Sequence, residues 1–214
     1  GLHGWSQTPG LLATQADLVN RSAQWRFVAV TPDITRPVPM WDVALDGADV
    51  AWVGALLDRL EADLCIDTNR IYVAGMSNGA MMTSTLACTM ADRIAAVAPV
   101  AGVRDPEGCA PSRPIPMVAF HGTDDEYLAY EGGYGAKVAG LAAPSGEGTL
   151  GDVQATGADA VPVPERVDAW AQRNGCDKSL DAPLWDDVTR FVGEGCDAGT
   201  ELYEVIGGGH TWPG

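Results

Sequence analysis

The stretch YVAGMSNGAMM, residues 72–82, sets an apolar run against Gly75-Met76-Ser77-Asn78-Gly79 and then returns to apolar residues. The first part is typical of a buried strand, and the segment after Gly79 has the apolar spacing of a helix. A serine between two glycines at a strand-to-helix turn matches G-x-S-x-G, the pattern of a nucleophile elbow. The simpler interpretation is a surface turn without chemistry. The rest of the chain has to decide between the two.

Composition and charge indicate one globular domain over residues 1–214 and argue against some partners. The chain is 46% hydrophobic, and its 214 residues suffice for a substantial core. No apolar run approaches the roughly 20 residues of a membrane-spanning helix, and no leader pattern is present, so we expect any signal peptide to have been removed. A net charge of −16 argues against nucleic acid and anionic membranes as partners, because both are bound by clustered Lys and Arg.

Apolar runs alternate with helix-period segments along the chain, which is the pattern of an α/β protein with a mainly parallel sheet flanked by helices. Several of the runs are rich in valine, so we expect strands that are buried on both faces of the sheet. Helices are expected within 42–64, 79–93 and 163–175. The expected strands are 26–32, 70–75, 95–100, 116–122 and 201–207.

Two parts of the chain depart from this alternation. Residues 131–162 are rich in Gly, Ala and Pro with little periodicity, and a loop of this length predicts a functional segment such as a lid over a cleft. The chain also opens with GLHGWSQ, in which LHG resembles the end of a strand although no strand precedes it. We therefore expect the numbered chain to lack the leading strands of the natural protein.

A serine nucleophile needs a base and a carboxylate, and nucleophile-elbow hydrolases carry them in the order Ser, Asp or Glu, His. His210 follows a predicted strand and three glycines near the end of the chain, so it is the candidate base for Ser77. Asp124 and Asp125 follow the strand at 116–122, where catalytic groups gather in parallel sheets. One of them is expected to orient His210. We interpret His121, on the same strand end, as a structural residue that holds the loop by a hydrogen bond.

Ester hydrolysis also needs backbone N–H groups that stabilise the oxyanion. The residue after the nucleophile, Asn78, supplies one candidate donor, and the LHGWSQ loop supplies Trp5 as the second. His3 is expected to support that loop. Trp5, Trp41 and Trp212 are candidate substrate contacts, because flat aromatic walls suit an aryl ring or a polymer segment. The alternative is that these tryptophans fill the core.

The five cysteines are too dispersed for a metal site or a redox motif. Cys109, Cys176 and Cys196 lie in loop-like contexts, which favours disulfides and a secreted, extracellular protein over buried free thiols. Local order suggests Cys88–Cys109 and Cys176–Cys196 with Cys65 unpaired, although spacing alone does not fix the connectivity. No metal-ligand spacing and no phosphate loop are present, so we expect neither a metal nor a cofactor.

Four segments carry a resemblance to a known family: YVAGMSNGAMMTSTLACTMADRIAAVAPVAG, PIPMVAFHGTDDEYLAYEGG, WAQRNGCD and GGGHTWPG. They are similar to the secreted polyhydroxybutyrate depolymerases and feruloyl esterases. These are α/β-hydrolases related to the carbohydrate esterases, including acetylxylan esterases. The resemblance covers the chain except for 140–162, and its GGGHTWPG and HGTxD segments are more specific than the serine motif.

The resemblance implies Ser77 as nucleophile, Asp125, the final D of HGTxD, as acid and His210 as base. It also supports Cys88–Cys109 and Cys176–Cys196. In related feruloyl esterases a cysteine at the position of Cys65 pairs with one nearer the N-terminus, which this chain lacks. Relatives generally have a second glycine where this chain has Ala80, a change that we expect the helix start to tolerate.

These observations predict a secreted serine carboxylesterase that acts on hydroxycinnamoyl or acetyl esters of plant polysaccharide, or on a polyester. The expected partner is a small-molecule or polymeric ester. An aromatic polyester such as a terephthalate plastic is an alternative that the tryptophans would suit. Further alternatives are a catalytically silent polymer-binding module and a serine peptidase on the same fold.

Overall fold

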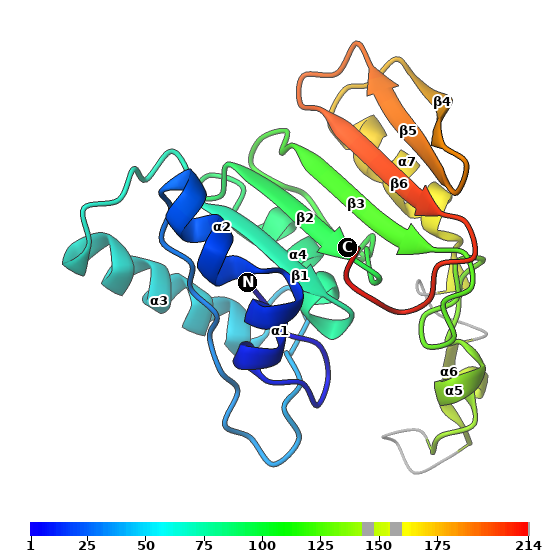
Figure 1. The fold of residues 1–214 in the computed structure, drawn as a ribbon, viewed down its shortest axis with the longest axis horizontal. Helices are drawn as coiled ribbons and strands as arrows, with labels where there is room; N and C mark the ends of the chain where they lie inside the picture. Colours follow the sequence, from blue (N-terminus) through cyan, green and yellow to red (C-terminus); the bar gives the residue numbers. More distant parts are fainter. Residues whose placement is uncertain (143–147, 155–159, 214) are drawn as a thin grey trace.

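The computed structural model describes residues 1–142, 148–154 and 160–213. Its centre is a six-stranded sheet in the order β1-β2-β3-β6-β5-β4, shown in Figure 1. The first four strands in this order are parallel, and β5 and β4 are added antiparallel at the far edge. The strands are β1 (Tyr72–Met76), β2 (Ala96–Val100), β3 (Met117–Gly122), β4 (Lys178–Trp185), β5 (Val188–Glu194) and β6 (Thr200–Val205).

Three longer helices confirm the helical segments expected from the sequence: α3 (Ala48–Asp63), α4 (Asn78–Thr89) and α7 (Val163–Arg173). Helices α4 and α7 pack against the sheet on one face, behind it in Figure 1. Two further helices precede the sheet, α1 (Pro9–Gln15) and α2 (Leu18–Trp25), and were not expected. The mainly parallel, helix-flanked sheet is thus as predicted.

The core lies on the helix side of the sheet, because alternate strand residues point there. Val73, Val97, Met117 and Leu202 are buried in one cluster with Trp170 of α7. On the second face, Ala96, Ala98, Val118 and Phe120 are only partly buried whereas Val100 is buried, so the expectation of strands buried on both faces is met only in part. The second face carries larger polar and aromatic groups instead, with the ring of Phe120 stacked on Tyr203 at 4.9 Å.

One expected strand and one expected loop differ from the structure. Residues 26–32 form no strand, because no ladder forms there: the Phe27 N–H donates to the Ser22 carbonyl at 3.2 Å, and the Val30 carbonyl accepts from the Gly1 amino group at 2.8 Å. Leu2, by contrast, pairs with β1: its N–H donates to Ala74 and its carbonyl accepts from Met76. The LHG segment therefore extends the sheet at β1, in agreement with its strand-like sequence.

Within the predicted insertion at 131–162, the structure describes two short helices, α5 (Ala136–Ala139) and α6 (Leu150–Gln154). The insertion is tethered to the end of β3, since the N–H groups of Gly135 and Lys137 donate to the carbonyls of Tyr127 and Glu126. Residues 143–147 and 155–159, on which part of the lid prediction rests, lie outside the described residues. Its role as a lid stays a prediction.

Both suggested disulfides are present. Cys88 joins Cys109, Cys176 joins Cys196, and Cys65 is an exposed free thiol. The first bridge attaches the end of α4 to the loop before β3, and the second closes the segment between α7 and β6. Two disulfides are consistent with an oxidising compartment.

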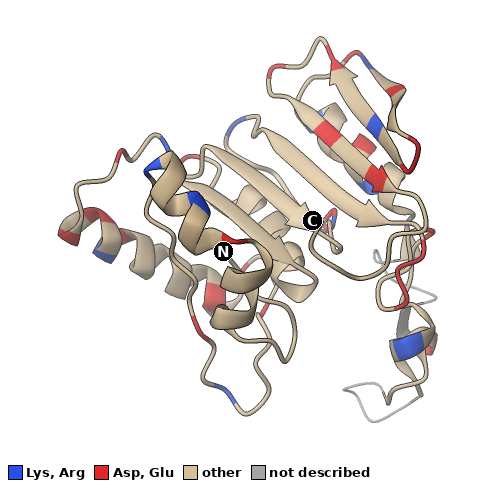
Figure 2. Cartoon of the chain, in the orientation of Figure 1, with Lys and Arg blue, Asp and Glu red and all other residues tan. Residues whose placement is uncertain are grey.

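Charge is distributed unevenly over this fold. Strands β1, β2 and β3 contain no Asp, Glu, Lys or Arg, whereas acidic residues gather on the outer strands and on exposed loops, as Figure 2 shows. In the described part of the chain, no helix is both long enough and apolar enough to cross a bilayer. The strands before Ser77 and Asp125 are therefore uncharged, whereas β6, which precedes His210, carries Glu201 and Glu204.

Candidate active site

Ser77 occupies the turn between β1 and α4 with φ 58° and ψ −122°. A non-glycine residue at positive φ is strained, and such strain is kept only where the surroundings determine it. Here the Ser77 N–H donates to the carbonyl of Val100, and the first turn of α4 follows at once. The predicted strand–serine–helix context, and the strained backbone that it requires, are confirmed.

The two glycines of the motif are needed because backbone passes directly against both of them. A Cβ on Gly75 would overlap the carbonyl of Gly79, and a Cβ on Gly79 would overlap the carbonyls of Leu2 and His3. Strand, helix and N-terminal loop therefore meet at the turn with no room for a side chain. This is the crowding that the sequence pattern predicts.

Asp125, rather than Asp124, reaches the candidate base. The Nδ1 of His210 lies 2.7 Å from Oδ2 of Asp125, across 85 residues of sequence. The other carboxylate oxygen accepts hydrogen bonds from the N–H groups of Tyr127 and Leu128. Asp124 is exposed, and its N–H donates to the carbonyl of Gly208 in the loop that carries His210.

His121 supports the same carboxylate. Its Nε2 lies 2.8 Å from the Leu128 carbonyl and 3.3 Å from Oδ2 of Asp125, so this nitrogen carries the proton that both acceptors need. The predicted loop-holding hydrogen bond of His121 is confirmed. Burial alone would raise the pKa of Asp125, but hydrogen bonds from His121, His210 and the Leu128 amide favour the ionised form and hold the pKa well below its ordinary value.

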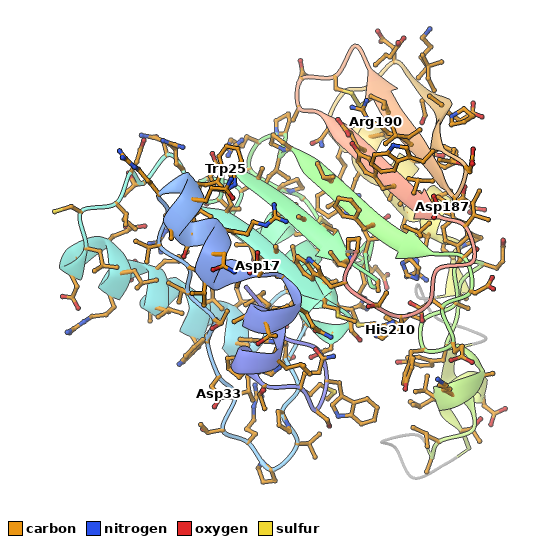
Figure 3. All side chains as sticks on the ribbon, in the orientation of Figure 1. Asp17, Trp25, Asp33, Asp187, Arg190 and His210 are labelled. Carbon is orange, nitrogen blue, oxygen red and sulfur yellow. A yellow bond between two sulfur atoms is a disulfide. The ribbon has the colours of Figure 1, made fainter. Side chains whose placement is uncertain are left out.

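The glycines before His210 let its loop lie on the end of β3. After β6 the chain turns back across the carboxyl ends of the parallel strands, and Figure 3 shows His210 at this edge. A Cβ on Gly122 would overlap the Gly208 carbonyl, and Gly207 adopts φ 70°. The N–H of Gly207 donates to Oγ1 of Thr123 at 2.8 Å. Hydrogen bonds therefore join the loop that carries His210 to the loop that carries Asp125.

Ser77, Asp125 and His210 follow β1, β3 and β6, whose carboxyl ends share one edge because the strands are parallel. The structure joins the acid to the base. The hydroxyl of Ser77 makes no hydrogen bond to any residue in the described part of the chain. Nucleophile–base contacts are commonly loose without substrate, and the catalytic assignment of the three residues stays a prediction.

Both predicted oxyanion donors lie near this turn. Asn78 is the residue after Ser77, and its N–H points from the open first turn of α4, where helix N–H groups have no internal partner. Trp5 follows Gly4, on which an added Cβ would lie 3.2 Å from Cβ of Ser77. His3 is fully buried beneath this loop, in line with its expected supporting role. Neither the Trp5 nor the Asn78 N–H donates to another described residue.

The three candidate tryptophans have different environments. Trp5 is 44% exposed and Trp212 is partly buried, so both can meet a substrate. Trp41 is 1% exposed, and its indole Nε1 donates to the His3 carbonyl at 2.9 Å. The expectation that Trp41 contacts substrate is therefore wrong, because its ring lies in the core beneath the N-terminal loop.

One aromatic residue at the site was not expected from the sequence. Tyr127 is 40% exposed, and its ring centre lies 4.9 Å from that of His210. Nζ of Lys137, in the insertion, lies over the Tyr127 ring at 5.2 Å, and Lys137 pairs with Glu126. The position of Tyr127, two residues after the catalytic-acid candidate, is the signal that could have identified it.

Comparisons with known proteins bear on the family and the fold. No protein-family model matches the chain. A feruloyl esterase B of Piromyces equi is 30% identical over 181 residues, which cover 80% of this chain and 31% of that protein. A bifunctional acetylxylan esterase/xylanase of Neocallimastix patriciarum is 32% identical over 130 residues, or 61% of this chain and 19% of that protein. The chain thus spans about a third or less of these two relatives.

Among solved structures, an acetyl xylan esterase from Aspergillus awamori superposes over 99% of this chain and 82% of its own, with a TM-score of 0.68 and 16% identity. At that identity the match establishes the fold alone. Together with the sequence matches, it confirms the expected α/β-hydrolase fold. The chain belongs to the feruloyl esterase and acetylxylan esterase family of α/β-hydrolases, relatives of the carbohydrate esterases.

Proposed function

We propose that the chain is a serine carboxylesterase that removes feruloyl or acetyl groups from plant polysaccharide. The single observation that supports this most directly is the hydrogen bond between His210 and Asp125 at the strand edge that also carries the strained Ser77. Relatives with feruloyl esterase and acetylxylan esterase activity in their names supply the substrate class. The two disulfides favour an extracellular site of action.

The proposed reaction follows from the proton positions. A carboxylate only accepts hydrogen bonds, so Nδ1 of His210 carries a proton toward Asp125 and Nε2 of the neutral ring is free to act as base. The base takes the Ser77 proton as Oγ attacks the ester carbonyl. The oxyanion is stabilised by the N–H groups of Asn78 and Trp5, and His210 then protonates the leaving alcohol. Water then attacks the carbonyl of the acyl-enzyme while His210 takes its proton. His210 returns that proton to Oγ of Ser77 as the bond between Ser77 and the acyl group breaks, which releases the free acid.

Trp5, Trp212 and Tyr127 are the proposed contacts for an aromatic acyl group. The partly exposed Tyr127 ring beside His210 favours hydroxycinnamoyl over acetyl esters, because an aryl ring gains by stacking where a methyl group does not. An aromatic polyester such as a terephthalate plastic would gain from the same stacking and is the second candidate substrate, whereas polyhydroxybutyrate, which has no aryl ring, is an alternative without this support.

The test compares wild type with Ser77→Ala on methyl ferulate, p-nitrophenyl butyrate and acetylated xylan. We expect hydrolysis by wild type and a loss of at least about 10³-fold in Ser77→Ala. Tyr127→Ala should lower kcat/KM for methyl ferulate more than for p-nitrophenyl acetate, while Tyr127→Phe keeps the preference. A film of polyhydroxybutyrate and a casein assay test the polyester and peptidase alternatives. Binding of xylan without any turnover would instead support the silent binding module.

A further inference from the structure

Residues 39–41 run between the two loops that carry the proposed oxyanion donors. On one side, the N–H of Ser6 donates to the Pro39 carbonyl at 2.9 Å. On the other, the backbone of Trp41 meets the first residue of α4. In the described part of the chain this segment makes no hydrogen bond to Ser77 or His210, yet it is bonded to Ser6, the neighbour of the candidate donor Trp5, and to the side chain of the candidate donor Asn78.

The Trp41 side chain holds the N-terminal loop. Its Nε1 donates to the carbonyl of His3 at 2.9 Å, and the imidazole of His3 lies 5.5 Å from the Trp41 ring. Both side chains are at most 1% exposed. His3 is two residues before Trp5, so a bond that holds the His3 carbonyl also restricts where the Trp5 backbone lies relative to Ser77. Gly4 between them bonds to the Gln7 side chain, which closes the turn.

The Asn78 side chain holds the other half of the site. Its Oδ1 accepts from the Trp41 N–H at 2.7 Å, and its Nδ2 donates to the Trp41 carbonyl at 3.3 Å. Only a carboxamide can accept from an N–H and donate to a carbonyl in this geometry, so an aspartate of the same shape would place negative charge against the Trp41 carbonyl. Asn78 is 8% exposed, so its side chain is largely shielded from solvent.

We propose that the Trp41 indole and the Asn78 carboxamide are positioning residues that set the spacing between the two oxyanion donors. This inference rests on the proposed function and deepens it. The Trp5 and Asn78 N–H groups belong to segments that are distant in sequence. Leu2 already pairs with β1, and Trp41 adds hydrogen bonds both to the N-terminal loop and to the Asn78 side chain. A donor displaced by a fraction of an ångström stabilises the transition state less, while substrate binding in the ground state changes little.

The test uses one change that keeps the side-chain shape, Asn78→Asp, one that shortens an aromatic side chain, Trp41→Phe, and a matched control. Trp41→Phe removes the indole donor but keeps an aromatic ring, and Asn78→Asp removes the amide donor. Trp52→Phe is the control, since its ring lies 6.3 Å from Trp41 and is 44% exposed. The measurements are kcat and KM on p-nitrophenyl butyrate, the Ki of a trifluoromethyl ketone, and the melting temperature. The ketone forms a tetrahedral oxyanion on the serine and so reports the oxyanion donors directly.

We expect each variant to lose about 10- to 100-fold in kcat with KM within about threefold, and Ki for the ketone to rise by the same factor as kcat/KM falls. Trp52→Phe should match wild type. The double variant Trp41→Phe/Asn78→Asp should lose little more than the worse single variant, because the bonds of Trp41 to His3 and to Asn78 act together as one linked set.

Two results would overturn the inference. If Trp41→Phe and Asn78→Asp have the activity and ketone affinity of Trp52→Phe, the hydrogen bonds of Trp41 do not position the donors. A fall in melting temperature with unchanged ketone affinity would show that their role is confined to stability. If Trp41→Phe does not fold, Asn78→Asp decides by the same criteria. A wild type without Ser77-dependent turnover would instead reject the proposed function, and with it this inference.

Discussion

The turn around Ser77 and the outer hairpin β4–β5 both adjoin the same sheet, but the turn is buried whereas strand β4 of the hairpin is exposed. Ten of the twelve residues of α4 are buried, and backbone touches both glycines of the turn. All eight residues of β4 are exposed, including Trp185 at 67%. A site that must hold atoms within fractions of an ångström is built where neighbours leave no freedom, whereas the hairpin can accept sequence changes.

The largest effect is expected when one methyl group is added at the buried turn. Gly79→Ala would drive a Cβ into the carbonyls of Leu2 and His3, so we expect loss of folded, active protein. Gly10→Ala is the matched control, because nothing lies within 4 Å of the added atom and α1 gains an alanine. It should be neutral or stabilise by about 0.5 kcal/mol. Soluble yield, melting temperature and ester turnover decide; a stable, active Gly79→Ala would contradict the crowding argument.

The next effect concerns the acid. Asp125→Asn keeps the shape but removes the charge that holds the proton on Nδ1 of His210, and we expect kcat to fall by about 10³- to 10⁴-fold. Asp124→Asn, the exposed neighbour, should stay within about threefold of wild type, in line with most surface substitutions. Equal losses in the two variants would mean that the base is oriented by another group.

The same carboxylate makes a prediction about acid stability. Because its folded pKa is lowered from 3.8, its ionised form stabilises the native state above that value, and the contribution disappears as the pH falls through the folded pKa. The free energy of unfolding of wild type minus that of Asp125→Asn should therefore shrink below about pH 4. Urea titrations across this range measure it. A difference that grows with acidity would contradict the lowered pKa.

The two disulfides allow a comparison at nearly constant loop length, since they close 21 and 20 residues of sequence separation. Loop entropy alone would make each worth about 3 kcal/mol. Cys88 is buried in the core cluster, whereas Cys176 and Cys196 are not. We expect Cys88→Ser/Cys109→Ser to lower the free energy of unfolding more than Cys176→Ser/Cys196→Ser, because it also buries unpaired polar groups. Equal losses would indicate that loop closure accounts for both.

The smallest effect is expected at the hairpin. Trp185→Ala should change the free energy of unfolding by less than about 0.5 kcal/mol and leave ester turnover unchanged. Trp170→Ala, in the core at 0% exposure, should cost about 3–5 kcal/mol. A large effect at Trp185 on polymer substrates, with none on small esters, would instead assign the hairpin a role in polymer binding.

The hairpin also shows where sequence patterns fail. Strand β4 is exposed on both faces and contains Pro183, so it has neither alternation nor a continuous apolar run. The segment at 26–32 has such a run but no ladder partner, and it is not a strand. Phe27 and Val28 of that run are even exposed, so an apolar pattern identified a strand only where the segment was also buried and paired, as in β1, β2, β3 and β6.

From the sequence, the strand–serine–helix turn could be predicted because it depends on local sterics, the two disulfides were suggested by the order of the cysteines, and the family resemblance pointed to Ser77, Asp125 and His210. The folded structure adds the contact between Asp125 and His210, the position of the Tyr127 ring beside the base, and the burial of Trp41 in the core instead of at the substrate surface. Those features rest on hydrogen bonds and ring contacts between residues that are tens of positions apart, and these form only when the sheet brings its strand ends to one edge.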